Sequence, residues 1–309
     1  MWFNQTPSYS FNNTKVNADG DRCLTAVVAI SSISLLICLF GLVGNGIVLW
    51  FLGFRIRKDP FTVYILNLAV ADFGFLLCMV VFLVMIILYL HFYFLGGLDI
   101  IQRIQWAGLF IYNTGLYLLT AISIQRCLSV LYPIWFRCHR PKNLSAIVCV
   151  LLWALSILVS GLECYFCISK YHCFKMTIFS CILSFLIFTP LMVLSSLSLF
   201  IKIWCNSQRR QPTKLYVVIL VNILCFLIFA IPLRVIVLMS LLSHRMIHIF
   251  VICLFILLSC VNSGINPFIY FLVGRHGRRQ LREPLKEILQ RIFSEEADPG
   301  DKRSTIHIK

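Results

Sequence analysis

Charged residues are scarce in this chain of 309 residues. Asp, Glu, Lys and Arg make up 13% of it, whereas a soluble domain carries about a quarter. Apolar residues make up 60%, and the mean hydropathy is +0.90. This composition excludes a disordered chain and disfavours a soluble fold, because too few charges remain to cover a surface exposed to water. The sequence therefore predicts a protein whose surroundings are lipid.

Patterns that bind metals or nucleic acids are also missing. No CxxC pair is followed by a second CxxC or an HxxxH pair, and most of the 14 Cys residues lie inside apolar runs, where Cys acts as a small hydrophobic side chain. The net charge of +15 comes from short basic clusters between those runs. We therefore expect no structural metal, no cofactor and no nucleic-acid partner.

The chain is rich in long apolar runs. A bilayer core about 30 Å thick needs about 20 apolar residues per helix, and seven runs are long enough. Backbone groups in lipid must be satisfied within each segment, which requires helices. The runs cover approximately residues 24–54, 61–90, 104–131, 144–162, 176–201, 215–242 and 249–273. The sequence thus predicts an all-α membrane protein, a bundle of seven transmembrane helices.

The distribution of basic residues predicts the orientation. Twenty of the 27 Lys and Arg residues fall in the first, third and fifth connections between the spans, at residues 55–60, 126–143 and 202–214, and in the tail from residue 274. Cytoplasmic loops carry such an excess, so we expect the amino terminus outside and the carboxyl terminus in the cytoplasm. Two glycosylation sequons, at Asn4 and Asn12, lie in the polar segment 1–23 on the predicted extracellular side. No cleaved signal peptide is expected there.

The segment after the last run has a pattern of its own. Apolar residues recur at helical spacing over 277–293 with charged residues between them, which is typical of a helix lying on the membrane surface. The sequence predicts three parts: a glycosylated extracellular segment 1–23, a transmembrane domain 24–273, and a cytoplasmic part 274–309 with a short amphipathic eighth helix and a tail.

Polar groups and helix-bending residues inside the spans mark candidate functional positions, because polar groups are costly in lipid. Their order along the chain is Gly41, Gly44 and Asn45; the run 67–72 ending in Asp72; Gln125, Arg126 and Cys127, then Tyr132 and Pro133; Trp153; Pro190; Pro232; and Asn266, Pro267 and Tyr270. Together these groups resemble the pattern of rhodopsin-like G-protein-coupled receptors. The runs 112–123, 126–135 and 267–271 resemble, more closely, the Mas-related receptors.

The resemblance covers nearly the whole chain and implies a function. It implies a multi-pass receptor of the plasma membrane, without catalytic chemistry, that passes the signal of an extracellular peptide or small amine to a heterotrimeric G protein. It also implies a role in sensory neurons, including nociception. A multi-span transporter is the alternative; it would need paired repeats and broken helices, which the sequence does not display.

The resemblance also assigns site residues. It places coupling and activation at Gln125, Arg126, Cys127, Asn266, Pro267 and Tyr270, although Arg126 could also contact water and lipid at the interface. It places an intramembrane polar site at Asp72, Asn45, Asn262 and Ser263. At Asp72 two interpretations stay open: a bound sodium ion, or a hydrogen-bonded carboxyl group without an ion.

Four residues are candidates for the ligand pocket. Glu163 stands at the spacing from the following cysteines found in Mas-related receptors that bind cations; the alternative is an interfacial Glu exposed to water. Arg234 should face the bundle, because a lipid-facing Arg costs at least ~2.5 kcal/mol. Trp106 and Tyr112 fit either a pocket or helix packing.

Several positions depart from the rhodopsin-like pattern. Ile101 replaces the expected third-span cysteine, so the usual disulfide cannot form. The Mas-related resemblance implies a bridge between Cys167 and Cys173, with Cys164 to Cys173 as the rival pairing. Gln125 replaces the acid beside Arg126, and Ala230 replaces the aromatic residue of the sixth span. We expect these losses to weaken the resting state.

Overall fold

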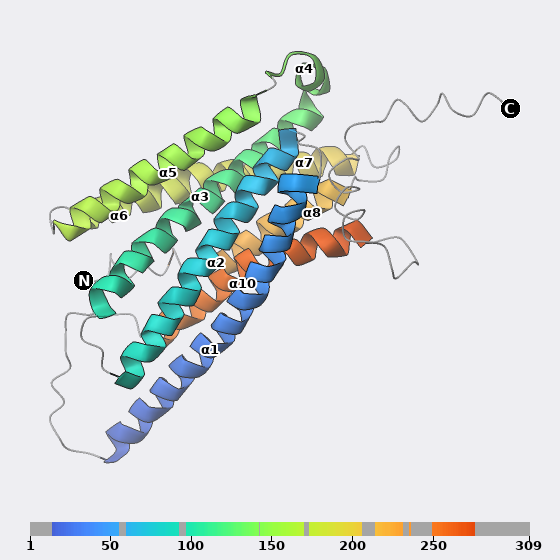
Figure 1. The fold of residues 1–309 in the computed structure, drawn as a ribbon. Coiled ribbons are helices and arrows are strands. Elements are labelled where there is room, and N and C mark those ends of the chain that lie inside the picture. Colours follow the sequence, from blue (N-terminus) through green and yellow to red (C-terminus); the bar gives the residue numbers. More distant parts are fainter. Residues whose placement is uncertain are drawn as a thin grey trace.

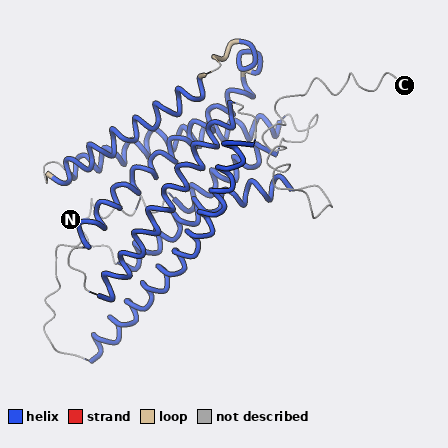
Figure 2. The backbone as a smooth tube through the Cα atoms, viewed as in Figure 1, coloured by secondary structure: helices blue, strands red, loops and turns tan. Residues whose placement is uncertain are grey.

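The described part of the chain is a bundle of helices (Figure 1, Figure 2). The structure is a computed structural model and describes residues 14–55, 60–92, 97–141, 143–169, 173–205, 214–230, 235 and 249–275. Over these ranges it contains no β-strand. The elements are α1 (Thr14–Trp50), η1 (Phe51–Arg55), α2 (Pro60–Phe92), α3 (Gly97–Leu131), α4 (Pro133–Cys138), α5 (Leu144–Ile168), α6 (Cys173–Ile182), η2 (Leu183–Phe188), α7 (Thr189–Cys205), α8 (Lys214–Cys225), η3 (Phe226–Ala230) and α10 (Ile249–Arg275).

The long helices match the apolar runs. Six of them, among the described residues, are long and apolar enough to cross a membrane, and a shorter apolar helix covers Leu220–Phe229. The sixth predicted span begins with α8 and η3 and continues past the described residues. Several helices run further than predicted; α5, for example, ends at Ile168 rather than near residue 162. The eighth helix and the sequons at Asn4 and Asn12 lie outside the described residues.

Three π-helical segments, written η, occur among the described residues, and η2 stands between two helices of one span. The turn η2 lies immediately before Pro190, near the start of α7. Proline has no N–H to donate, and its ring crowds the carbonyl of the residue four positions earlier, here Leu186. A locally widened helix relieves this conflict. The fifth span is therefore one continuous segment, α6–η2–α7, with a change of geometry in its middle.

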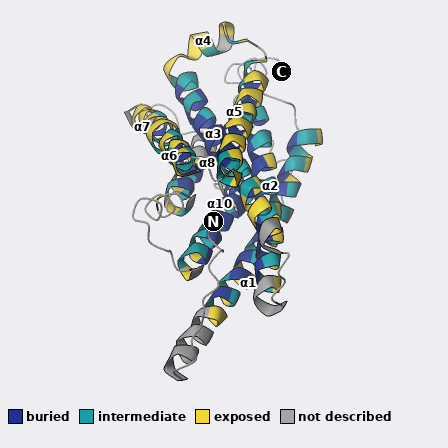
Figure 3. Cartoon of the chain, turned by 90° about the vertical axis from the view of Figure 1, so that its left-hand side faces the viewer, coloured by how far each residue is buried: buried dark blue, intermediate teal, exposed yellow. Residues whose placement is uncertain are grey.

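Many polar side chains of the spans are buried together with an apolar core, while many large apolar side chains are exposed; Figure 3 colours the chain by burial. Asn45, Asn113 and Ser156 are fully buried, whereas Leu186 is 70% exposed and Phe40 is 68% exposed. This pattern is the reverse of a soluble protein and suits a bundle surrounded by lipid, where polar groups must find partners inside. Asp72, Asn262, Ser263 and Asn266 are likewise buried.

Glycine allows α1 and α10 to approach closely. A Cβ atom on Gly41 would lie 2.9 Å from the Cα of Gly264 and 2.7 Å from Leu76 Cδ1, and one on Gly44 would lie 3.1 Å from the ring of Pro267. Small residues at such contacts let helix backbones pack in membranes. The α1–α10 contact therefore has no room for a larger side chain at Gly41.

We expect Gly41→Ala to destabilise the folded receptor by about 1–3 kcal/mol, because the added methyl meets backbone that cannot rotate away. The measurement is the thermal unfolding midpoint of purified receptor in detergent. Gly161→Ala is the matched control, since a Cβ there has nothing within 4 Å. An equal midpoint for both variants would contradict the close packing.

Candidate functional site

A buried carboxylate lies in the middle of the bundle. Asp72 of α2 is 6% exposed, and Asn266 Nδ2 of α10 donates a hydrogen bond to its Oδ2 at 2.6 Å. The Ser263 side chain also hydrogen-bonds to Asp72. Ser263 and Asn266 are three residues apart and so share a face of α10. The structure thus brings two of the four predicted polar-site residues, Asp72 and Ser263, together with Asn266 across two helices.

Asn45 connects α1 to the same cluster. Its Nδ2 donates to the carbonyl oxygens of Ser263 and Gly41, each at 3.0 Å. Its buried Oδ1 has no hydrogen-bond partner within the part of the chain that the structure describes. A sodium ion at Asp72 stays a prediction. The free Asn45 Oδ1 fits it as an oxygen ligand.

The arginine of the predicted coupling site is buried. Arg126 of α3 is 1% exposed, and its guanidinium carbon lies 3.4 Å from the ring centroid of Phe61, which is itself 3% exposed. This is the geometry of a cation–π contact. Arg126 therefore lies against α2, inside the bundle rather than in the lipid interface.

The neighbouring Gln125 makes hydrogen bonds to Tyr64 and Arg140. In the amide orientation that its surroundings require, its nitrogen donates to Tyr64 Oη at 3.0 Å, and its oxygen accepts from two guanidinium nitrogens of Arg140 at 2.8 and 2.9 Å. Arg140 also donates to Ser145 Oγ near the start of α5. Gln125 therefore ties α3 to α2 and to the segment that follows α4.

Of the other predicted coupling residues, Asn266 is the partner of Asp72, and Tyr270, Pro267 and Cys127 are placed as follows. Tyr270 of α10 is 1% exposed and accepts a long hydrogen bond of 3.5 Å from Asn222 Nδ2 of α8. Pro267 lies inside α10, one turn before Tyr270, and Cys127 is buried beside Arg126. The Tyr270 hydroxyl thus links the seventh span to the sixth.

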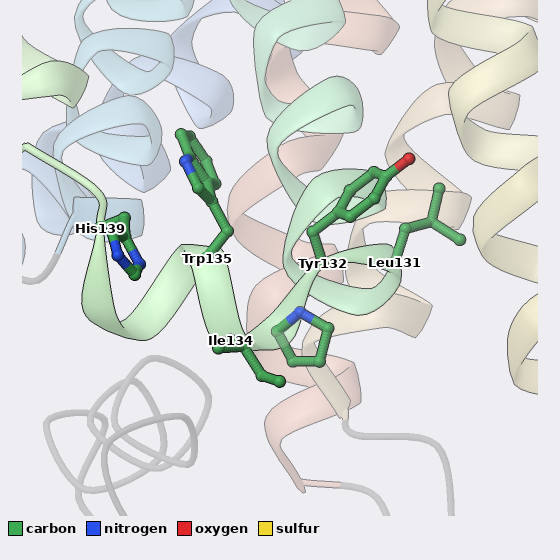
Figure 4. Close-up of a pocket in the computed structure, with 6 residues that line it drawn as sticks. Leu131, Tyr132, Ile134, Trp135 and His139 are labelled. Carbon is green, nitrogen blue, oxygen red and sulfur yellow. The ribbon is translucent and has the colours of Figure 1, made fainter.

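Beyond the end of α3, the short helix α4 carries exposed apolar side chains. Ile134 is 76% exposed and Tyr132 is 60% exposed. They line a shallow hollow together with Leu131, Pro133, Trp135 and His139 (Figure 4). This segment connects two spans, so its exposed apolar surface is a candidate contact for a protein partner.

At the opposite end, Glu163 of α5 is 2% exposed. It therefore does not lie at the interface in contact with water, which was the alternative. The indole nitrogen of Trp106 in α3 is buried without a hydrogen-bond partner within the described ranges. The Tyr112 ring lies between Phe75 and Phe226, at centroid distances of 6.0 and 6.2 Å. Arg234 lies outside the described residues.

The cysteines near this end are distinguished by the structure. Cys167 is disulfide-bonded, whereas Cys164 is a free thiol, so the rival pairing through Cys164 is not present. The side chain of Cys173 lies outside the described residues, and the Cys167–Cys173 bridge stays a prediction.

We expect non-reducing peptide mapping of receptor from the cell surface to recover a peptide that links Cys167 to Cys173. Their separation of six positions suits a bridge in an oxidising compartment. The free Cys164 serves as the internal control and should be alkylated. Recovery of both Cys167 and Cys173 as alkylated thiols would contradict the bridge.

Several contacts of these sites could not be found from the sequence. The partners Phe61, Tyr64 and Arg140 carry no motif of their own, and Asn222 is a single polar residue in an apolar span. One signal was available: Phe61 and Tyr64 are three residues apart, so they share a helix face. Nothing in the sequence indicated that this face meets Gln125 and Arg126.

A comparison with known protein families identifies the family of this chain. Residues 44–270 match the model of the 7 transmembrane receptor (rhodopsin family), and the chain belongs to this family. The protein is therefore a seven-transmembrane receptor of the membrane, and the transporter alternative does not hold.

Individual relatives narrow the type. The chain is 49% identical over 269 residues to the proto-oncogene Mas of Mus musculus, covering 84% of this chain and 82% of that protein. It is 48% identical over 271 residues to the Mas-related G-protein coupled receptor member H of Rattus norvegicus, covering 85% and 83%. To member D of Homo sapiens it is 43% identical over 290 residues, covering 90% and 89%. The predicted Mas-related type is confirmed.

Proposed function

We propose that the protein is a plasma-membrane receptor with its amino terminus outside, which converts binding of an extracellular peptide or amine into nucleotide exchange on a heterotrimeric G protein. It has no catalytic chemistry of its own. Lipid surrounds the helices, and the receptor works in sensory neurons, including nociceptors, as the Mas-related type suggests.

The observation that carries the proposal is the buried arginine at one end of α3. Arg126 is 1% exposed and lies against Phe61, while the neighbouring connection exposes Ile134 and Tyr132. A G protein that binds the exposed apolar surface is positioned to receive Arg126 when the bundle opens. Opening is then an equilibrium between two states, which ligand shifts by binding them unequally.

The buried acid at the opposite end supports the ligand class. A carboxylate that is 2% exposed has lost its water and gains most from a cationic partner. Glu163 therefore favours ligands with an amine or a basic side chain. Arg234, two residues past Pro232, offers a positive group for the carboxylate of a peptide.

Cells that express the chain, screened against libraries of peptides and amines, test this function. Calcium and cyclic AMP responses should appear for cationic members and be absent from cells carrying an Arg126→Ala variant at equal surface abundance. Responses confined to neutral or anionic ligands would contradict the ligand class.

For ligands found in this way, we expect Glu163→Gln and Arg234→Gln each to lower potency at least about tenfold, or ~1.4 kcal/mol. The reason is the loss of a charge partner in a site removed from water. Arg103→Gln is the control, because Arg103 is exposed near the start of α3. Unchanged potency for every active ligand would remove both residues from the pocket.

A further inference from the structure

Two consecutive residues at the end of α3, Gln125 and Arg126, each contact one residue on the same face of α2. Tyr64 accepts from the Gln125 amide at 3.0 Å. Phe61, one turn earlier on the same face, lies under the guanidinium of Arg126 at 3.4 Å. Because the two α2 residues are three positions apart, a single setting of α2 against α3 makes both contacts.

The residue beside Arg126 on α3 is an amide, not an acid. The adjacent residue is Gln125, whose amide oxygen is directed to Arg140. Pro212 stands where the sixth span of rhodopsin-like receptors can offer an acid. The Phe61 ring offers the guanidinium a neutral partner with a negative face.

The burial of both partners shows which state the contact favours. Arg126 is 1% exposed and Phe61 is 3% exposed, so neither can touch a protein bound at this end. Arg126 must leave the Phe61 ring before it can meet a G protein. Any free energy in the contact therefore favours the state that does not couple.

We propose that Phe61 is a positioning residue for coupling, which holds Arg126 inside the bundle through a cation–π contact and so sets the resting activity of the receptor. The inference rests on the proposed function, because coupling is what the contact restrains. This role differs from simple packing because it depends on the π system of the Phe61 ring. A side chain of similar bulk without an aromatic ring cannot replace Phe61.

The first test is ligand-free nucleotide exchange on a panel of heterotrimers, normalised to surface receptor. Phe61→Leu should raise exchange about tenfold over wild type, because Leu keeps bulk but has no ring. Phe61→Tyr keeps the ring and should stay far closer to wild type. Phe82→Leu is the matched control: Phe82 lies on the same helix and is 5% exposed, in a different apolar cluster. Equal exchange for Phe61→Leu and Phe82→Leu would overturn the inference.

The second test does not depend on a G protein. A double-mutant cycle on the thermal unfolding of purified receptor compares Phe61→Leu, Arg126→Met and the pair. The double variant should lose less than the sum of the single losses, because each single change already removes the contact. Strict additivity would overturn the inference.

The two tests separate failure of the inference from failure of the proposed function. If no receptor variant exceeds the exchange of cells without receptor on any heterotrimer, the proposed function is contradicted and the inference falls with it. The stability cycle would then show whether the contact exists apart from coupling. If wild type couples and only the Phe61 effect is missing, the inference alone is wrong.

Discussion

Replacing Ile134 by Asp will lower ligand-stimulated nucleotide exchange at least about tenfold, while ligand binding and surface abundance stay unchanged. Ile134 is 76% exposed on α4, which lies just past the end of α3 that carries Arg126. Apolar anchors at the centre of a protein interface commonly contribute 2 kcal/mol or more, or about thirtyfold in affinity. An Asp in their place also carries a charge that the partner must strip of water.

The control for this result is Ile134→Leu, which preserves the apolar surface and should keep most of the exchange. Both variants are compared at equal surface abundance and with the same ligand. If Ile134→Asp couples as well as Ile134→Leu, the hollow on α4 is not the docking surface, and its exposed apolar residues have another explanation.

Restoring an acid beside the arginine will lower resting activity. We expect wild type to show ligand-free exchange, and Gln125→Glu to reduce it about tenfold, or ~1.4 kcal/mol. The amide oxygen of Gln125 already accepts from Arg140 at 2.8 and 2.9 Å. A carboxylate there makes a charge-assisted contact of greater strength and lies next to Arg126 as well.

A second variant distinguishes the two arginines. If the acid acts through Arg140, then Arg140→Gln should abolish the effect of Gln125→Glu; if it acts on Arg126, the effect should persist. Exchange in wild type at the level of cells without receptor, or no change in Gln125→Glu, would show that the missing acid does not set the resting state.

The spans were predictable because membrane insertion depends on a simple quantity, the length of an uncharged run. The cost of polar groups in lipid likewise indicated that Asp72 and Asn266 face inward, and they bond at 2.6 Å. What composition cannot give is the exact end of a helix: α3 begins at Gly97, ahead of the apolar run from 104. A helix can extend beyond an apolar run into polar residues, because its backbone hydrogen bonds do not depend on apolar side chains.

The contacts of Arg126 and Gln125 were not predictable for a different reason. Phe61 and Arg126 are 65 positions apart, and their meeting depends on how α2 is rotated about its axis against α3. Asp72 indicates which face of α2 turns inward, but the otherwise apolar sequence does not show which α3 residues that face meets. Spacing alone could not choose between Cys164 and Cys167, since both lie near the end of one helix, a turn apart. The family resemblance favoured Cys167, and Cys167 is the bonded one of the two.

The central claim is that ligand binding at the Glu163 end drives nucleotide exchange at the Arg126 end. It is tested most directly with purified receptor in lipid nanodiscs, a purified heterotrimeric G protein and a cationic ligand from the screen. We predict exchange that rises with ligand occupancy in wild type, falls to that of empty nanodiscs in Ile134→Asp, and needs more ligand in Glu163→Gln. Saturable ligand binding to wild-type receptor, with exchange no faster than in empty nanodiscs for any heterotrimer, would contradict the claim.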